Sequence, residues 1–293
     1  MRRVAYLGPE GTNSHEALLN ASAGEACELV SLPTIYDCVI AVQEGEAERA
    51  FVPIENALEG SVNATLDALA VETEDVAIVG EHVHPIHTCL IARAPLELSA
   101  VETVVSHPQS LGQCAHFLRT RLPQARVLAA SSTAEAVRAV AEREDHGAAL
   151  GSRVAAERYG CVVLCADVDD AAGNETRFVW LERRGAAAVG PGPAHPAGSA
   201  PAAAGPGPWK TAIVFWGVGA EAPGWLVRCL SEFAFRGVNL TRIESRPRKQ
   251  GLGRYMFFLD LEGSAAEGPV AEALEALRAH VEHLRVLGSF PAA

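Results

Sequence analysis

The sequence predicts an α/β protein with a two-lobed N-terminal domain and a smaller C-terminal domain, and three observations predict this. Up to residue 184, short apolar strands alternate with amphipathic helices, a pattern typical of a largely parallel sheet covered by helices. Residues 185–208 are almost entirely Ala, Gly and Pro, which is typical of a semi-extended linker. Residues 209–293 then follow the ferredoxin-like βαββαβ order.

The elements of the N-terminal domain, 1–184, are predicted from apolar periodicity. Strands are expected at 3–8, 27–32, 49–55, 101–107, 125–131, 147–152 and 161–168, with helices at 14–21, 34–46, 61–71, 108–122, 132–144 and 152–160. Residues 76–94 form a long β-rich stretch that suggests strands crossing between two lobes, and 176–183 returns to the first lobe. We therefore expect one lobe at about 1–92 with 174–184, and the other at 93–173.

The C-terminal domain, 209–293, is predicted by the same signals. Strands are expected at 210–218, 238–247, 255–263 and 284–290, and helices at 224–237 and 269–283. The glycines of "KQGLGR" indicate a hairpin turn between the two central strands.

Composition excludes several classes of partner. The chain of 293 residues has a formal net charge of −12, and its one basic run, 246–254, is short and broken by glycine. This argues against binding to nucleic acid or to an anionic membrane. No apolar run reaches the ~18 residues of a membrane span, and Gly8, Pro9 and Glu10 follow the first arginines too closely for a signal peptide.

The seven cysteines indicate a reducing compartment. Their number is odd and they form no CxxC pair, which argues against a disulfide framework or a zinc site. A cytoplasmic location is the simplest expectation.

Polar clusters follow the predicted strands, at the carboxyl ends where α/β sheets bind ligands. In "GPEGTNSHEA" (8–17), Thr12, Asn13 or Ser14 can cap the next helix, whose backbone N–H groups then face any anion. In "VPIENALEGSVNATLD", Glu55 and Asn56 end a strand and Ser61 precedes a helix, so Glu55 is a candidate general acid or orienting acceptor. A plain capped turn and a hydrogen-bonded loop carboxylate remain the structural alternatives.

Two further clusters lie in the second half of the domain. Ser106 and His107 end a strand in "SHPQSLGQC", and Gln109 lies on the helix that follows. His107 is a candidate acid or base, although a serine cap with a structural histidine explains the pattern as well. Residues 131–133 are hydroxyl residues that cap another helix.

The stretch "GNETRFVWLERR" (173–184) places the hydroxyl of Thr176 and the guanidinium of Arg177 at the mouth of an apolar strand. None of the clusters has metal-ligand spacing, and "HVHPIH" (82–87) offers alternating histidines with little carboxylate support. No cofactor motif is present, so no cofactor is expected. The inventory of hydroxyls, amides and helix N-termini suits a small anionic ligand, bound by an enzyme or by a solute-binding module.

Taken in order, "GPEGTNS", "VPIEN" with "EGSV", "SHPQSLGQC", "SSTAEA" and "GNETRF" resemble the motifs of the prephenate dehydratases. Past the linker, "PGWLVRCLSEFAFRGVNLTRIESRP" and "YMFFLDLEG" resemble the ACT regulatory domain of the same enzymes. The resemblance implies a catalytic domain of periplasmic-binding-protein-like, two-lobed fold, which converts prephenate to phenylpyruvate, water and carbon dioxide. It also implies feedback inhibition by phenylalanine and a homodimer or homotetramer.

The resemblance implies roles for the clustered residues. Thr176 matches the residue essential for dehydration, as a hydrogen-bond donor to the departing oxygen, and Glu55 and His107 are the titratable candidates. Arg177 is expected either to clamp a substrate carboxylate or to form a structural salt bridge. The remaining substrate-binding candidates are Thr12, Asn56, Ser61, Ser106 and Gln109.

The resemblance also implies an effector site for phenylalanine in the C-terminal domain. Trp225 stands where the family commonly has a small residue, a departure that either narrows the effector pocket or lies outside it. The expected effector residues are Gly224, Trp225, Leu226, Val227, Asn239, Leu240, Glu244, Ser245, Arg246 and Pro247.

Two alternatives to a prephenate dehydratase remain from the sequence. An arogenate dehydratase would act on the analogue with an amino group in place of the side-chain keto oxygen. A non-catalytic amino-acid sensor would bind ligands in both domains, although the intact Thr176–Arg177–Phe178 triplet argues against it. We also expect an enzyme without a fused chorismate mutase, since no such helix precedes Met1 or follows Ala293.

Overall fold

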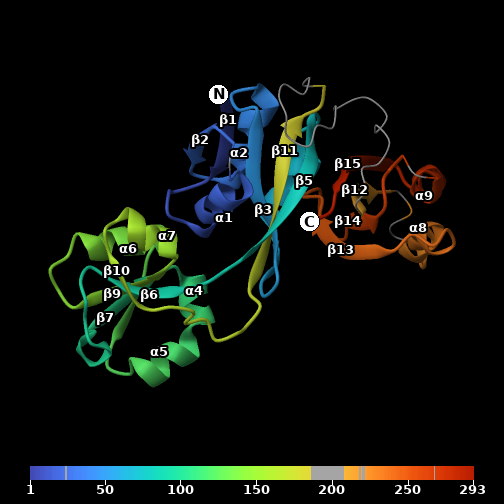
Figure 1. The fold of residues 1–293 in the computed structure, drawn as a ribbon. Coiled ribbons are helices and arrows are strands. Elements are labelled where there is room, and N and C mark those ends of the chain that lie inside the picture. The colour runs from blue at the N-terminus through green and yellow to red at the C-terminus, as the bar shows by residue number, and fades with distance from the viewer. Residues whose placement is uncertain (24, 186–207, 218, 220–221, 267) are drawn as a thin grey trace.

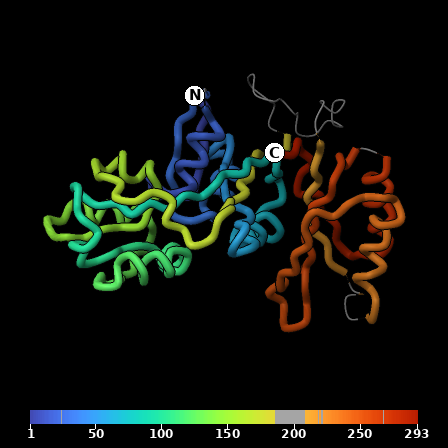
Figure 2. The backbone as a smooth tube through the Cα atoms, turned by 60° about the horizontal axis from the view of Figure 1, so that its bottom comes forward, coloured from blue at the N-terminus to red at the C-terminus, as the bar shows by residue number. Residues whose placement is uncertain are grey.

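The computed structural model describes residues 1–23, 25–185, 208–217, 219, 222–266 and 268–293. Two α/β lobes and a C-terminal domain follow one another along the molecule, with the first lobe in the middle (Figures 1 and 2). The predicted linker, 185–208, lies almost entirely outside the described ranges. Among the helices of these ranges, none combines the length and the apolar character of a membrane span.

The first lobe is built on a mixed sheet. Its strands follow the order β2 (Cys27–Leu32), β1 (Arg2–Leu7), β3 (Arg49–Asn56), β11 (Glu175–Arg183) and β5 (Val76–Pro85), with β4 (Gly60–Ser61) paired to β3. β1 runs parallel to β2 and β3, whereas β11 is antiparallel to both its neighbours. The helical segments are α1 (Asn13–Ala21), α2 (Ile35–Glu44), α3 (Asn63–Asp67) and the π-helical turn η1 (Ala68–Glu72).

The second lobe contains a sheet of its own. Its strands follow the order β10 (Val162–Cys165), β6 (Cys89–Ala92), β9 (Gly147–Gly151), β7 (Thr103–Ser106) and β8 (Arg126–Ala129). Its helices are α4 (Pro108–Gln113), α5 (Ala115–Arg121), α6 (Thr133–Ala141), α7 (Arg153–Arg158) and the short η2 (Leu98–Ala100).

The structure of the second lobe differs from the sequence predictions at two points. We expected Cys89–Ala92 in the first lobe, but this segment is β6 and pairs with β9 and β10. The crossing segment is therefore shorter than expected, because the chain enters the second sheet at once after residue 88. The predicted helix 108–122 is divided into α4 and α5 at Cys114, whose φ of −115° and ψ of 19° are not helical.

The C-terminal domain has the predicted βαββαβ order. Its elements are β12 (Trp209–Trp216), α8 (Trp225–Ala234), β13 (Leu240–Pro247), β14 (Tyr255–Glu262), α9 (Gly268–Arg278) and β15 (His283–Pro291). The strands lie in the order β13, β14, β12, β15 and every pairing among them is antiparallel.

Both faces of the C-terminal sheet are buried. Along β12, Ile213 and Phe215 pack beneath α8 and α9, whereas Ala212 and Val214 belong to a core shared with the first lobe. This is the alternation of side chains along a strand. At the shared interface, a Cβ on Gly288 would lie 2.1 Å from the carbonyl oxygen of Ile78, so the backbones of β15 and β5 approach closely.

Candidate active site between the lobes

A polar cleft of about 830 Å³ lies between the two lobes. Its walls come from the carboxyl ends of first-lobe strands, from helix N-termini of the second lobe, and from the segments that cross between the lobes. The side chains that line it include Thr12, Asn56, His107, Gln109, Gln113, Ser132, Glu135, Asn174, Thr176 and Phe178. Of the sequence-predicted site residues, the cleft thus brings together Thr12, Asn56, His107, Gln109 and Thr176.

Thr176 and Asn56 form the centre of the cleft floor. They face each other across β11 and β3, and the Asn56 amide donates to the Thr176 hydroxyl oxygen at 3.0 Å. The side-chain oxygen of Asn56, Oδ1, accepts hydrogen bonds from the backbone N–H groups of Leu58 and Glu59, both at 3.0 Å. Because the amide is oriented in this way, Thr176 receives a hydrogen bond and keeps its own proton available for an acceptor in the cleft.

Asn174 and Gln113 extend this arrangement, and the sequence did not assign either of them to the site. Asn174 is buried, accepts from the Asn56 amide at 2.9 Å and donates to Gln113 at 3.4 Å. Gln113 in turn donates to Glu59 at 3.3 Å. A polar chain therefore runs from the second lobe to Thr176. Two features of the sequence could have assigned them to the site: Asn174 comes two residues before Thr176, and Gln113 lies one helical turn after Gln109.

The N-termini of two helices line the cleft. Thr12 caps α1 by accepting the N–H of His15 at 3.4 Å, and Ser132 caps α6 by accepting that of Glu135 at 3.0 Å. The first turn of a helix carries backbone N–H groups that have no acceptor within the helix, so each N-terminus is a favourable place for a carboxylate.

His107 lies at the start of α4 and lines the cleft. Its Nδ1 accepts the backbone N–H of Gln109 at 3.3 Å. In its neutral form the ring therefore carries its proton on Nε2 and can act as a hydrogen-bond donor.

His84 lies opposite Thr176 on β5 and is buried. Burial, together with the neighbouring His82 and His87, lowers the pKa of His84 to about 4, so the ring is neutral near pH 7. Within the described ranges, no group of three or more His, Cys, Asp or Glu side chains is arranged to hold a metal ion.

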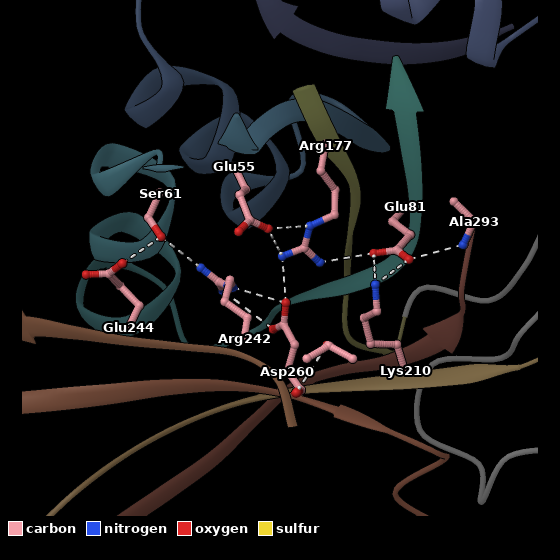
Figure 3. A network of polar contacts seen from close by, with 10 residues as sticks. Glu55, Ser61, Glu81, Arg177, Lys210, Arg242, Glu244, Asp260 and Ala293 are labelled. Atoms are coloured by element: carbon pink, nitrogen blue, oxygen red, sulfur yellow. Dashed lines mark hydrogen bonds and ion pairs between the residues drawn. The ribbon is translucent and has the colours of Figure 1, made fainter. Parts of the chain in front are cut away.

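Glu55, Ser61 and Arg177 lie on the opposite face of the sheet, toward the C-terminal domain (Figure 3). The pairing of β11 with β3 shifts between Arg177 and Phe178, so that Arg177 faces Glu55 while Phe178 faces Pro53. Ile54 is the extra residue of this bulge, and it changes which residues of β3 face the cleft. Asn56 consequently faces the cleft with Thr176, while Glu55 faces away with Arg177.

Two more predicted substrate-binding residues are engaged elsewhere. Ser61 donates to Glu244 at 2.8 Å, across the interface with the C-terminal domain. Ser106 is fully buried and donates to the carbonyl oxygen of Leu150 at 2.8 Å. Phe178 is buried against Phe51, with stacked rings 4.8 Å apart, as expected of a core residue at the edge of the cleft.

The residues expected to bind the effector are divided between two regions. Glu244 and Arg246 point toward the first lobe, where Arg246 pairs with Asp67 at 3.1 Å. Trp225 is buried in the core of the C-terminal domain and donates to the carbonyl oxygen of His280 at 2.8 Å. Among the other expected effector residues, Gly224 precedes α8 as its N-cap, with φ 77°, and Val227 is exposed on that helix.

A polar cleft between two α/β lobes, lined by a directed hydroxyl, amides and helix N-termini, has the arrangement of a protein built to enclose a small molecule. Residues 4–186 match the family model of prephenate dehydratase. The chain belongs to the prephenate dehydratase family, which confirms the resemblance of the motifs that lie before the linker.

Individual relatives match this chain over almost its full length. The prephenate dehydratase of Amycolatopsis methanolica is 42% identical over 291 residues, which cover 99% of this chain and 88% of that protein. The structure of prephenate dehydratase from Arthrobacter aurescens in complex with L-Phe has a TM-score of 0.84 and 34% identity, covering 99% of this chain and 90% of that one. A structure described as a novel type of quorum quenching acylase has a TM-score of 0.81 and 28% identity, covering 100% of this chain and 98% of that one.

Proposed function

We propose that this protein is a prephenate dehydratase, which converts prephenate to phenylpyruvate, carbon dioxide and water. Family membership and relatives of that activity at about 40% identity support it. The single observation that carries the mechanism is the Thr176 hydroxyl, which accepts from Asn56 and faces the cleft.

The reaction requires one proton at the departing oxygen. The bond between the ring and its carboxylate breaks, its electron pair enters the ring, and the C4–O bond breaks with its pair on oxygen. The oxygen leaves as water after taking up one proton, and the ring becomes aromatic. Thr176 is a very weak acid, so its role is to donate a hydrogen bond to the oxygen as negative charge develops there.

The two substrate carboxylates fit the donors of the cleft walls. The N-terminus of α1 at Thr12 and that of α6 at Ser132 come from opposite lobes, and His107 and Gln109 lie beside them in the lining. The chain has a net charge of −12, but salt screens the repulsion between a bound anion and distant carboxylates. The short-range hydrogen bonds of these donors can therefore still bind an anion in the cleft.

Two variants of Thr176 test the proposal. Thr176→Val keeps the shape but removes the hydroxyl, and we expect kcat to fall by roughly 10²–10⁴-fold, as for loss of a donor at a reacting atom. Thr176→Ser is the matched control and should retain most of the activity. Formation of phenylpyruvate from prephenate is followed by its absorbance, and formation of phenylalanine from arogenate is measured separately for comparison. Absence of turnover by the wild type would refute the proposed activity, and an active Thr176→Val would refute the role of Thr176.

For the C-terminal domain we propose an ACT domain that binds phenylalanine and inhibits the enzyme. Its βαββαβ order and the complex of the Arthrobacter relative with L-Phe support this. Val227 on α8 and Phe235, which directly follows that helix, are apolar and exposed, and they favour association of two C-terminal domains in a homodimer or homotetramer, with the effector between subunits. Calorimetric titration with phenylalanine, with sedimentation in its presence and absence, tests both points; no heat of binding would contradict the effector role.

A further inference from the structure

A polar network on the back face of β11 joins the strands of the cleft floor to the C-terminal domain (Figure 3). The Arg177 guanidinium contacts three carboxylates: Nη2 is 2.6 Å from Asp260 and 2.9 Å from Glu55, and Nη1 is 3.1 Å from Glu81. Glu55 and Glu81 come from β3 and β5, the strands on either side of β11. Asp260 comes from β14. One guanidinium therefore ties three adjacent strands of the first lobe to the C-terminal sheet.

Asp260 is the member of this network that the C-terminal domain supplies to Arg177. Its side chain is 2% exposed, and it also accepts from Arg242 Nε at 3.1 Å. Burial opposes the charged form of Asp260, but the charges of Arg242 and Arg177 outweigh it and hold the pKa of this carboxyl below its ordinary value. Asp260 is therefore an anion near pH 7, shared between one arginine of each domain.

The network acts on the bulge that shapes the active site. Arg177 and Glu55 are the pair at which the register of β11 and β3 shifts, and their side chains are joined by two contacts of 3.1 and 2.9 Å. That bulge is what places Asn56 on the cleft face, where it orients the Thr176 hydroxyl. Arg177 and Thr176 are also adjacent in β11, so a shift of one backbone unit moves both.

The geometry points to Asp260 as a positioning residue for the active site: by holding Arg177, the C-terminal domain keeps the bulge of β3 that turns Asn56 toward Thr176. This rests on the proposed dehydratase function. It makes Arg177 part of the support behind the strand, in place of a clamp on the substrate. β13 carries Arg242 and the predicted effector residues Glu244 and Arg246. Through Arg242, Asp260 and Arg177, a movement of β13 can therefore displace the Thr176 hydroxyl.

Asp260→Asn in the full chain tests the inference. The amide keeps the size of the carboxylate but removes its charge, so Arg177 loses its anchor in the C-terminal domain. We expect kcat for prephenate to fall about 10- to 100-fold, since small misplacements of catalytic groups cost on the order of 10²-fold, while KM changes less than about twofold. Asp260→Glu restores the charge and should recover part of the lost kcat. Arg177→Lys probes the same link from the other side, and its effect should not add to that of Asp260→Asn.

The matched control is Asp67→Asn, which removes another interdomain ion pair. Asp67 binds Arg246 at 3.1 Å and Lys249 at 3.2 Å, away from the bulge, so kcat should stay within about twofold of the wild type. If Asp67→Asn lowers kcat as much as Asp260→Asn does, or if Asp260→Asn has wild-type kcat, the inference is wrong. Should Asp260→Asn fail to fold, Asp260→Ser removes the same charge with a smaller side chain and gives the same decision.

Amide hydrogen exchange separates the inference from the proposed function, because it requires no turnover. We expect faster exchange in residues 174–179 of Asp260→Asn than in the wild type, and unchanged exchange there in Asp67→Asn. A wild type without prephenate turnover but with this exchange pattern would refute the proposed function and leave the positioning role standing. Wild-type exchange in Asp260→Asn would refute the positioning role, whatever the substrate.

Discussion

Gly288 is the position at which a single methyl group should separate the C-terminal domain from the first lobe. In Gly288→Ala the new Cβ would lie 2.1 Å from the carbonyl oxygen of Ile78 and 2.8 Å from its carbonyl carbon. Ordinary contact begins at 3.4 Å, so β15 and β5 must move apart by about 1 Å or distort. Overpacking of this kind typically costs about 1–3 kcal/mol.

Thermal unfolding measures this effect. With about 2 °C lost per kcal/mol in a chain of this size, we expect Tm to fall by roughly 2–6 °C. Gly268→Ala is the matched control in the same domain, because nothing lies within 4 Å of its added Cβ, and its Tm should stay within about 1 °C of the wild type. An unchanged Tm in Gly288→Ala would refute the close packing of β15 on β5.

Three further predictions follow from buried groups and from the shared core. His84 has a folded-state pKa of about 4, below the ordinary 6.5, so between these pH values the unfolded chain binds a proton that the folded chain does not. The free energy of unfolding should therefore fall by up to about 3 kcal/mol as the pH drops from 6.5 to 4. In urea unfolding, His84→Gln should lose this pH dependence of the free energy, whereas the exposed His87→Gln should keep it. Arg285 donates to the carbonyl oxygens of Leu69 and Val76 in the first lobe at 2.9 and 3.0 Å, so Arg285→Met should lower Tm by several degrees in calorimetry, since buried acceptors lose their donor; an unchanged Tm would contradict this. A chain ending at residue 184 should lose phenylalanine inhibition and melt at lower temperature, and full inhibition of that chain would exclude regulation through the C-terminal domain.

The sequence predicted the order of elements well because periodicity is a local property. The βαββαβ order of the C-terminal domain and the alternation in the lobes follow from apolar spacing within each element. The position of β6 could not be predicted in this way, since pairing partners far apart in the sequence decide which sheet a strand joins. Residues 76–94 contain both a first-lobe and a second-lobe strand, and their composition changes little between them.

The site was predicted in part, and the bulge in β3 explains most of the difference. Simple alternation places Glu55 on the same face as Phe51 and Pro53, which would bring it into the cleft. Ile54 interrupts that alternation, so Glu55 faces the C-terminal domain and Asn56 replaces it. A bulge has no reliable signal in one sequence, because it depends on the register with the partner strand. For Arg177, the sequence left a substrate clamp and a structural salt bridge open, and the structure shows ion pairs with Glu55, Glu81 and Asp260.

The core shared by the first lobe and the C-terminal sheet has a consequence for how the chain acquires its structure. During synthesis the N-terminal portion emerges first, and its apolar surface around Ile78 stays uncovered until β12, β14 and β15 have been made. The nascent protein therefore passes through a stage in which this apolar surface is exposed to solvent. Completion of the last strand covers that surface. Truncated products should therefore aggregate or be degraded before they can act as enzymes without feedback inhibition.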